Sequence, residues 1–313
     1  MNMDNSIAPV VLFTYKRLDT LIHTVQCLRN NYLASQTDLF IFCDGSKNTT
    51  DNDKVRAVQN FCDQIEGFKS VTVFKSPINK GLANSVKQGV SEILKTHGQA
   101  IVLEDDLETT PNFLDYMNQA LDVYKNVPQV FSISGYTFPL ERKGLKQDVF
   151  FHPRGSSWGW ATWADRWNTV NWQILQTVSI SDMIKARDMG SDWVPLIKKV
   201  KAQTNDSWAI PWIVNQCLQG SFTVYPTSSK ISNIGFGPEA THTQKSNHRF
   251  LTTLDEGTQR KFRMEQKVTR HPGLIRQFNH RLSYWYRAYS LLHFYSTQLW
   301  SKIVSKPETV VPQ

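Results

Sequence analysis

Four apolar residues run directly into three acidic ones in the stretch Ala100-Ile101-Val102-Leu103-Glu104-Asp105-Asp106. A short continuous apolar run is typical of a strand that is buried on both faces of a parallel sheet. In such sheets ligands bind beyond the carboxyl ends of the strands, which is where the three carboxylates would lie. Adjacent carboxylates repel one another, so the arrangement favours a divalent cation that neutralises them. A solvated acidic turn is the alternative, but the position after a buried strand favours the cation site.

Similar apolar runs on both sides of this stretch predict further strands. They cover residues 10–13, 39–43, 71–74 and 130–133. Apolar residues at helical spacing lie between them, at residues 55–65 and 82–94, and Gly98 is placed to end the second of these helices. A third helix is expected to open with Thr110 as N-cap and Pro111 in its first turn. The alternation predicts the α/β class, with a mostly parallel sheet flanked by helices.

The composition of the chain changes after residue 140. A polar loop is expected at residues 141–147, and a strand at residues 222–225. Five tryptophans fall within one short segment, at positions 158, 160, 163, 167 and 172. Most of them are expected in the core, with one or two lining a cleft. Residues 228–247 are rich in Gly and Ser and predict a loop, and the aromatic, basic tail at residues 276–300 has helical spacing.

The bulk composition indicates a globular protein of one large or two small domains. The chain has 313 residues, with 40% hydrophobic and 20% charged residues and a net charge of +8. The positive charge is compatible with an anionic partner, but no dense Lys/Arg run indicates nucleic acid. The four cysteines form no CxxC pair, and Cys27, Cys43 and Cys62 are expected to be buried. No apolar run reaches the roughly 20 residues of a membrane span, and no signal peptide is recognised, so a cytoplasmic protein is expected.

The acidic triplet, the strand order and the tryptophan segment together resemble the GT-A glycosyltransferases. The resemblance covers roughly residues 8 to 245 and is closest to the N-acetylglucosaminyltransferase I type and its bacterial family 2-like relatives. It implies an inverting transfer from a nucleotide sugar, usually a UDP-sugar, with Mn²⁺ or Mg²⁺ as cofactor. On this basis residues 1–140 are expected to bind the nucleotide sugar, residues 141–250 to bind the acceptor, and residues 251–313 to form a helical extension.

The resemblance assigns the donor-binding residues to the ends of the predicted strands. Thr14 and Arg17, at the turn after the first strand, would approach the nucleotide. Asp44 in Cys43-Asp44-Gly45-Ser46 would hold uracil, although it could instead only cap a turn. Lys80 in Asn79-Lys80-Gly81-Leu82 would face the diphosphate at a helix start, or be solvated. The resemblance makes Asp106 the metal ligand, and it gives contacts with ribose, donor sugar or metal-bound water to the other two acids of the triplet, Glu104 and Asp105.

Two later segments resemble the catalytic half of the family. Asn205-Asp206-Ser207-Trp208 is similar to a Trp-Asp-Asp-Trp segment, and the resemblance makes Asp206 the catalytic base. The sequence lacks the first Trp and the second Asp of that segment. Ser232-Asn233-Ile234-Gly235-Phe236-Gly237 and the following Thr241-His242-Thr243 resemble a loop of the bacterial relatives. His242 is a candidate metal or diphosphate ligand there, or a histidine with a structural role.

The implied acceptor is a glycan or lipid-linked glycan of a bacterial surface polysaccharide. The basic, aromatic tail from Arg281 to Trp300 could lie on the inner membrane as a peripheral contact, or pack against the catalytic domain. A sugar nucleotidyltransferase is an alternative, but the turn at residues 14–17 has no glycine for a phosphate loop. A non-catalytic glycan-binding protein is another alternative, and the retained acidic triplet speaks against it.

Overall fold

The computed structural model describes residues 7–142, 144–202, 206–236 and 248–304. Within these residues eight strands form one sheet in the order β3-β2-β1-β4-β8-β6-β9-β7, and β10 and β5 form a small second sheet. The strands are β1 (Val10–Thr14), β2 (Asp38–Cys43), β3 (Ser70–Lys75), β4 (Gln99–Glu104), β5 (Leu107–Thr109), β6 (Val130–Ser134), β7 (Val149–His152), β8 (Trp160–Trp163), β9 (Phe222–Pro226) and β10 (Ile231–Asn233).

The large sheet is mostly parallel, as predicted. β1 pairs in parallel with β2 and β4, and β2 pairs in parallel with β3. β8 is antiparallel to both β4 and β6, so β6 runs in the same direction as β4, and β9 is parallel to β6. Only β8 and the edge strand β7 run the other way among the described strands, and the sequence pattern predicted neither of them. The result is a GT-A (Rossmann-like) fold, with its crevice at the carboxyl ends of β1 and β4.

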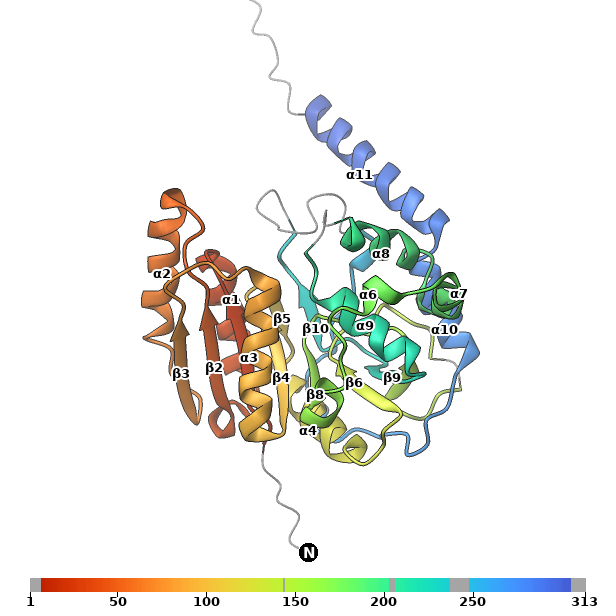
Figure 1. Ribbon diagram of the computed structural model, residues 1–313, viewed down its shortest axis with the longest axis horizontal. Coiled ribbons are helices and arrows are strands. Elements are labelled where there is room, and N and C mark those ends of the chain that lie inside the picture. The colour runs from red at the N-terminus through yellow and green to blue at the C-terminus, as the bar shows by residue number, and fades with distance from the viewer. Residues whose placement is uncertain (1–6, 143, 203–205, 237–247, 305–313) are drawn as a thin grey trace, which may run out of the picture.

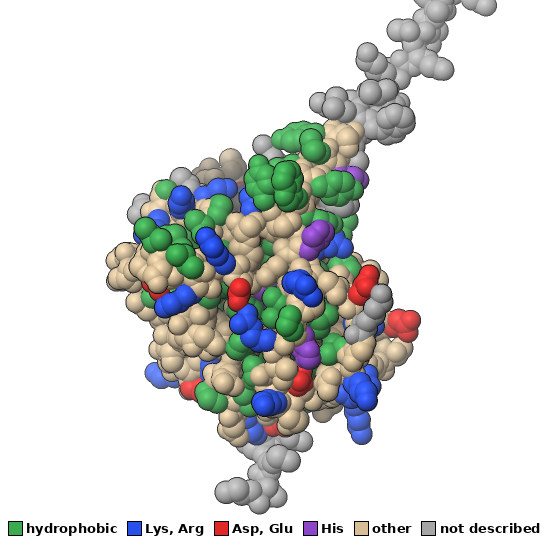
Figure 2. Space-filling model, turned by 90° about the vertical axis from the view of Figure 1, so that its right-hand side faces the viewer, with side chains coloured by type: hydrophobic (Ala, Val, Ile, Leu, Met, Phe, Trp, Pro, Cys, Tyr) green, Lys and Arg blue, Asp and Glu red, His purple; other side chains and the backbone are tan. Residues whose placement is uncertain are grey.

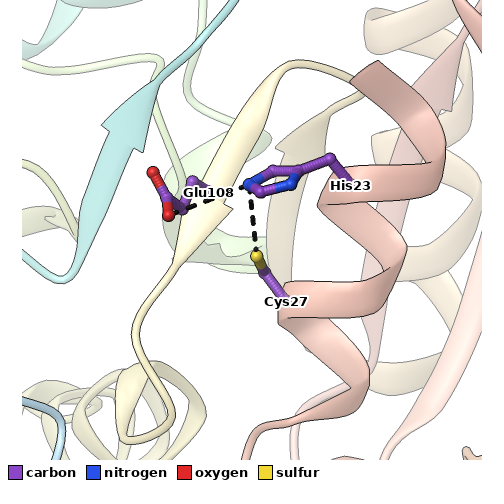
Figure 3. Close-up of side chains that lie close together, drawn as sticks. All are labelled: His23, Cys27 and Glu108. Carbon is purple, nitrogen blue, oxygen red and sulfur yellow. Dashed lines mark hydrogen bonds and ion pairs between the residues drawn. The ribbon is translucent and has the colours of Figure 1, made fainter. Parts of the chain in front are cut away.

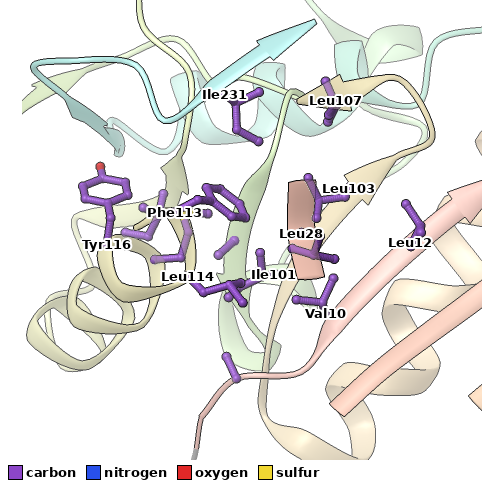
Figure 4. Close-up of a cluster of buried hydrophobic side chains, with 14 of the residues drawn as sticks. Val10, Leu12, Leu28, Ile101, Leu103, Leu107, Phe113, Leu114, Tyr116 and Ile231 are labelled. Carbon is purple, nitrogen blue, oxygen red and sulfur yellow. The ribbon is translucent and has the colours of Figure 1, made fainter. Parts of the chain in front are cut away.

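Helices cover both faces of the sheet (Figure 1). The longer ones are α1 (Leu18–Arg29), α2 (Asn52–Cys62), α3 (Leu82–His97), α4 (Phe113–Tyr124), α8 (Trp193–Lys201), α9 (Ala209–Leu218), α10 (Pro272–Arg281) and α11 (Tyr284–Val304). Short helices lie between β8 and α8: α5 (Ala164–Trp167), α6 (Ile174–Thr177) and α7 (Ile180–Lys185). Apolar residues of α1, α2 and α4 share one core with the sheet, part of which Figure 4 shows, and those of α3, α8 and α9 share the opposite core.

Burial along the strands differs from the prediction at the edge of the sheet. β1, β4 and β6 are almost wholly buried, as a continuous apolar run predicts, but β2 alternates between buried and half-buried residues. β3 has the same kind of run, but its residues are half-buried or exposed and none is fully buried, because it is the outermost strand and has one neighbour. Gly98 ends α3 with a φ of 73°, as predicted, whereas α4 begins at Phe113 and Thr110 is not its N-cap.

The tail forms two helices instead of one. Leu274 and Phe278 of α10 pack against aromatic residues of the sheet, including Phe150 and Tyr225. α11 leaves the body of the protein, and hydrophobic side chains gather on its surface (Figures 1 and 2). The described part of the chain contains no helix with the length and apolar character needed to cross a membrane.

Candidate active site

A cleft of about 900 Å³ opens at the carboxyl ends of β1, β2 and β4. The residues that line it form two groups, which we name by their charge. The acidic wall comprises Thr14, Arg17, Asp44, Glu104, Asp105, Asp106, Asn233 and Gly235. The basic wall comprises Arg154, Trp158, Asp192, Asp206, Trp208, Arg249 and Arg287. Most of the residues predicted for the site therefore lie in one cleft.

Asp105 is fixed by the strand next to its own. Phe13 of β1 lies opposite Glu104 of β4, which brings the next residues of the two strands together. The Thr14 hydroxyl donates to Asp105 Oδ2 at 2.9 Å, and the Tyr15 N–H donates to the same oxygen at 3.3 Å. Arg17 Nη2 donates to Asp105 Oδ1 at 2.6 Å. Both oxygens of Asp105 are thus bound within the acidic wall.

Arg17 joins two of the three carboxylates. Its Nη2 lies 2.6 Å from Asp105 Oδ1 and 2.7 Å from Asp106 Oδ2. Burial alone would lower the pKa of Arg17, but the two carboxylates raise it above the ordinary value. The guanidinium therefore stays charged and holds Asp106 in the cleft, in contact with the residues where the sequence predicted donor binding.

The acidic wall holds three carboxyl groups beside one guanidinium, and these carboxyl groups oppose one another's ionisation. Burial raises the pKa of Glu104 to about 8, with further contributions from Asp106 and Asp105. Burial also raises the pKa of Asp106, and Arg17 opposes that shift. Three carboxylates beside one guanidinium supply the oxygen ligands that Mg²⁺ and Mn²⁺ prefer. The donor set therefore fits a hard divalent cation.

The segment after β10 lies directly against Asp106. The Ile234 N–H donates to the Asp106 carbonyl at 2.9 Å, and Asn233 Nδ2 lies 3.5 Å from Asp106 Oδ1. A Cβ atom on Gly235 would lie 2.0 Å from Asp106 Oδ2. Only glycine fits here without moving the carboxylate. The sequence motif that contains Asn233 and Gly235 was identified, but it suggested no contact with the acidic triplet.

Asp44 organises the turn before α3. Its carboxylate accepts the N–H groups of Gly45 at 2.9 Å, Lys80 at 2.8 Å and Gly81 at 2.9 Å. The backbone groups expected to face a diphosphate are therefore bound to Asp44. Lys80 is exposed, with its Nζ 3.1 Å from Gln88 Oε1, and it is not among the residues that line the cleft. Asp44 itself is buried and borders the cleft.

The residues predicted as catalytic base and as further metal ligand are not part of the acidic wall. Asp206 is exposed on the basic wall, just before α9, and the buried Trp208 follows it. His242 lies outside the described residues. Of the five clustered tryptophans, Trp158 lines the cleft and Trp160, Trp163 and Trp167 are buried, in agreement with the expectation that most of them are in the core.

A separate group of ligand atoms lies outside the cleft (Figure 3). His23 Nε2 lies 3.5 Å from Cys27 Sγ and 3.8 Å from Glu108 Oε1. Cys27 is half-buried, not buried as expected, and burial followed by the charge of Glu108 raises its pKa. Thiolate and imidazole suit zinc better than Mg²⁺ or Mn²⁺. This group is therefore no substitute for the oxygen ligands of the acidic wall.

The fold and the acidic cleft place the protein among the GT-A glycosyltransferases. A sequence model described as glycosyl transferase family 2 matches residues 10–175, which is more than half of the chain. The chain belongs to this family. The matched residues include β1, β2, β4 and the complete acidic triplet.

Two solved structures are similar to the chain over about half of its length. One is the mannosyltransferase PcManGT from Pyrobaculum calidifontis in complex with GDP-Man and Mn²⁺, with 12% identity, 52% of this chain and 46% of that chain covered, and a TM-score of 0.34. The other is S. aureus TarS, with 12% identity, 48% and 25% covered, and a TM-score of 0.30. The chain spans less than half of the length of either protein. Among curated protein sequences, none matches the chain.

Proposed function

We propose that the protein transfers a sugar from a nucleotide sugar, with a UDP-sugar as the favoured donor, to a hydroxyl of a glycan by an inverting mechanism. The observation that carries the proposal is the acidic wall, where Glu104, Asp105 and Asp106 meet Arg17 at the carboxyl ends of two adjacent parallel strands. Such a transfer needs a base for the acceptor hydroxyl, charge compensation for the departing diphosphate, and alignment of the two substrates.

Asp106 is the residue that would hold Mn²⁺ or Mg²⁺, with His242 as a further candidate ligand, and Glu104 would contact ribose, donor sugar or metal-bound water. When bound, the cation would neutralise the charge that develops on the leaving diphosphate. Asp105, held by Thr14 and Arg17, would keep the triplet in position. In this proposal Thr14, Arg17, Asp44 and Lys80 belong to the donor-binding half, residues 1–140.

Asp206 is the proposed base. It lines the cleft as part of the basic wall. Because it is exposed, an acceptor hydroxyl can reach it. Its carboxylate would accept the proton of that hydroxyl during attack on the sugar carbon. This role assigns acceptor binding to residues 141–250. Residues 251–313 are the proposed helical extension, of which Arg287, Ser290 and Leu291 on α11 line the same cleft.

The outer face of α11 suggests a peripheral contact with an anionic lipid surface. Trp285, Leu292 and Tyr284 are 80%, 71% and 65% exposed. Between Glu265 and Glu308 the chain has seven Lys or Arg residues and no acidic residue. Exposed aromatic side chains with basic neighbours are typical of helices that lie in a membrane interface. A contact of this kind at the inner membrane would suit a lipid-linked glycan acceptor in bacterial surface polysaccharide synthesis.

The proposal is tested by a donor screen that measures nucleotide release, with Asp106→Ala as the inactive control. Release from one nucleotide sugar by the unaltered chain, and its loss in the variant, is the expected result. Asp53→Ala is a matched control, because that side chain is 94% exposed on α2 and forms an ion pair with Arg56 on the surface.

A thermal-shift panel of nucleotides with Mn²⁺ separates the alternatives. Stabilisation by UDP supports sugar transfer. Stabilisation by CTP or ATP would instead support a sugar nucleotidyltransferase, and stabilisation by no nucleotide would support a glycan-binding protein without catalysis.

A further inference from the structure

The basic wall holds more positive charge than the protein itself compensates. Arg154 is paired with Asp192 through two hydrogen bonds, of 2.8 and 3.1 Å, and also donates to the Met189 carbonyl at 2.8 Å. Arg249 and Arg287 line the same part of the cleft. Asp192 is the carboxylate that acts most strongly on Arg249, and its oxygens are already engaged by Arg154. Arg154 and Arg249 thus share Asp192, and the described part of the basic wall has three guanidinium groups for two carboxylates, Asp192 and Asp206.

Among the three arginines of the basic wall, Arg249 has the fewest polar contacts with the described residues. It is half-buried, and its guanidinium has no hydrogen bond or ion pair with any residue that the structure describes. Its recorded contact is with the ring of Phe250, 4.3 Å below it. Burial lowers the pKa of Arg249, and although Asp192 opposes this effect, Arg154 and Arg287 add to it. A partly buried charge without its own counter-charge destabilises a fold, so its presence points to a ligand.

Arg287 is placed to act with Arg249. It comes from the first turn of α11, a helix that lies beside the short helix containing Arg249. Its Nη1 has one long contact, 3.5 Å from Ser191 Oγ, and it has no carboxylate partner among the described residues. Two guanidinium groups with free N–H donors therefore border the same cavity. Planar guanidinium groups match the geometry of phosphate and carboxylate oxygens.

An aromatic surface adjoins the two arginines. Trp158 lines the cleft and packs edge-on against Phe250 at 5.2 Å and Tyr136 at 4.8 Å. Aromatic rings in clefts bind the apolar faces of sugars, so a sugar over Trp158 would bring its substituents near Arg249.

We propose that Arg249 and Arg287 bind an oxyanion carried by the acceptor, so that the acceptor is an anionic glycan bearing a phosphate or a carboxylate. The inference rests on the proposed function, because it takes the acidic wall as the place of the donor. The proposed function assigns the donor diphosphate to the acidic wall, so the oxyanion at Arg249 is assigned to the second substrate. Asp206 on the same wall places the proposed base beside that substrate.

Calorimetric titration of the full chain with inorganic phosphate and with D-glucuronate tests the subsite, with neutral D-glucose as the reference. EDTA is present throughout, so that no cation draws anions to the acidic wall. One of the two anions is expected to bind more tightly than glucose. Arg249→Gln is expected to weaken that binding by roughly ten- to hundredfold, the value of a charge-assisted hydrogen bond. Arg276→Gln is the matched control, since Arg276 is exposed on α10 and lies outside the cleft.

The two anions distinguish the sources of the charge. Preference for phosphate identifies a phosphorylated or lipid-phosphate-linked acceptor, and preference for glucuronate identifies an acidic sugar. Binding of neither anion, or binding that Arg249→Gln leaves unchanged, would overturn the proposal.

Thermal stability separates ligand binding from a structural role. A structural arginine would lower the Tm when replaced, whereas Arg249→Gln is expected to leave the Tm unchanged or raise it. A Tm lowered by several degrees would overturn the assignment. Nucleotide release by the unaltered chain is measured independently. Release without Arg249-dependent anion binding removes the subsite alone, and Arg249-dependent anion binding without release removes the proposed function alone.

Discussion

The two walls of the cleft differ in how their charged side chains are paired within the protein. On the acidic wall, Asp44 and Asp105 are bound by hydroxyl, guanidinium and backbone N–H groups of the same wall. On the basic wall, Arg154 has its own carboxylate, whereas Arg249 has no such partner among the residues that the structure describes. In the proposed function the acidic wall is organised before its cation binds, whereas the basic wall would be completed by its substrate. The difference predicts which substitutions affect stability and which affect turnover.

Asp206→Asn is expected to have the largest effect of the substitutions on the basic wall. The amide cannot take the acceptor proton, so kcat should fall roughly a hundred- to ten-thousandfold. Donor affinity, measured by nucleotide titration with Mn²⁺, should stay the same, because the donor is assigned to the other wall. A variant with nearly full activity would show that another group is the base. A weakened donor affinity would show that the basic wall also contributes to donor binding.

Asp192→Asn should instead affect stability, because it removes the ion pair between Asp192 and Arg154 within the basic wall. The side chains of Asp192 and Arg154 are 7% and 14% exposed, so the variant leaves Arg154 nearly buried without a counter-charge. A loss of about 3 kcal/mol in the free energy of unfolding is expected, as measured by urea denaturation. Asp165→Asn, at a side chain that is 68% exposed, is the comparison and should change stability much less.

The same pair gives a pH dependence of known sign. Burial would raise the pKa of Asp192, but Arg154 lowers it below the ordinary value. A group with a lowered folded-state pKa stabilises the protein above its unfolded pKa, about 4, and loses that contribution as the pH falls through the folded pKa. The unaltered chain should therefore lose stability below about pH 4 more steeply than Asp192→Asn. Equal slopes for the two proteins would show that Asp192 is not paired in solution.

Gly235→Ala tests the contact between the acidic wall and the segment after β10. The new Cβ would lie 2.0 Å from Asp106 Oδ2, so either the carboxylate or the segment must move. A displacement of this size at a cation ligand is expected to lower activity roughly tenfold to a hundredfold. Gly273→Ala is the matched control, since no atom lies within 4 Å of its Cβ position, and it should keep full activity. Higher Mn²⁺ should partly restore Gly235→Ala.

The sequence predicted the acidic wall far better than the basic wall, and the reason is topological. Thr14, Asp44 and the acidic triplet each follow an apolar run, and the ends of parallel strands meet at one edge of a sheet. Nothing comparable brings Arg154, Asp192, Arg249 and Arg287 together, because they come from segments with no shared periodicity. Their pairing depends on the packing of the second half of the chain, where Arg249 lies beside α11.

Short strands were missed for a related reason. β8 (Trp160–Trp163) and β7 (Val149–His152) each have four residues, which is too short for an alternating or continuous apolar pattern to predict a strand. Their burial comes from the sheet and helices around them, which a local pattern does not contain. β3 shows the reverse case, since its apolar run predicted an inner strand and the sheet ends there.

The smallest effect on folding is expected on the outer face of α11, the helix that also provides Arg287. Trp285 is 80% exposed, so Trp285→Ser should change the free energy of unfolding by less than about 0.5 kcal/mol. If this face contacts lipid, the same variant should bind less well to vesicles that contain anionic phospholipid, as measured by co-sedimentation. Neutral vesicles are the control, because the seven basic residues of this part of the chain would contribute little there. Unchanged binding to anionic vesicles would show that Trp285 makes no contact with lipid. A clear loss of stability would show that Trp285 packs against protein instead.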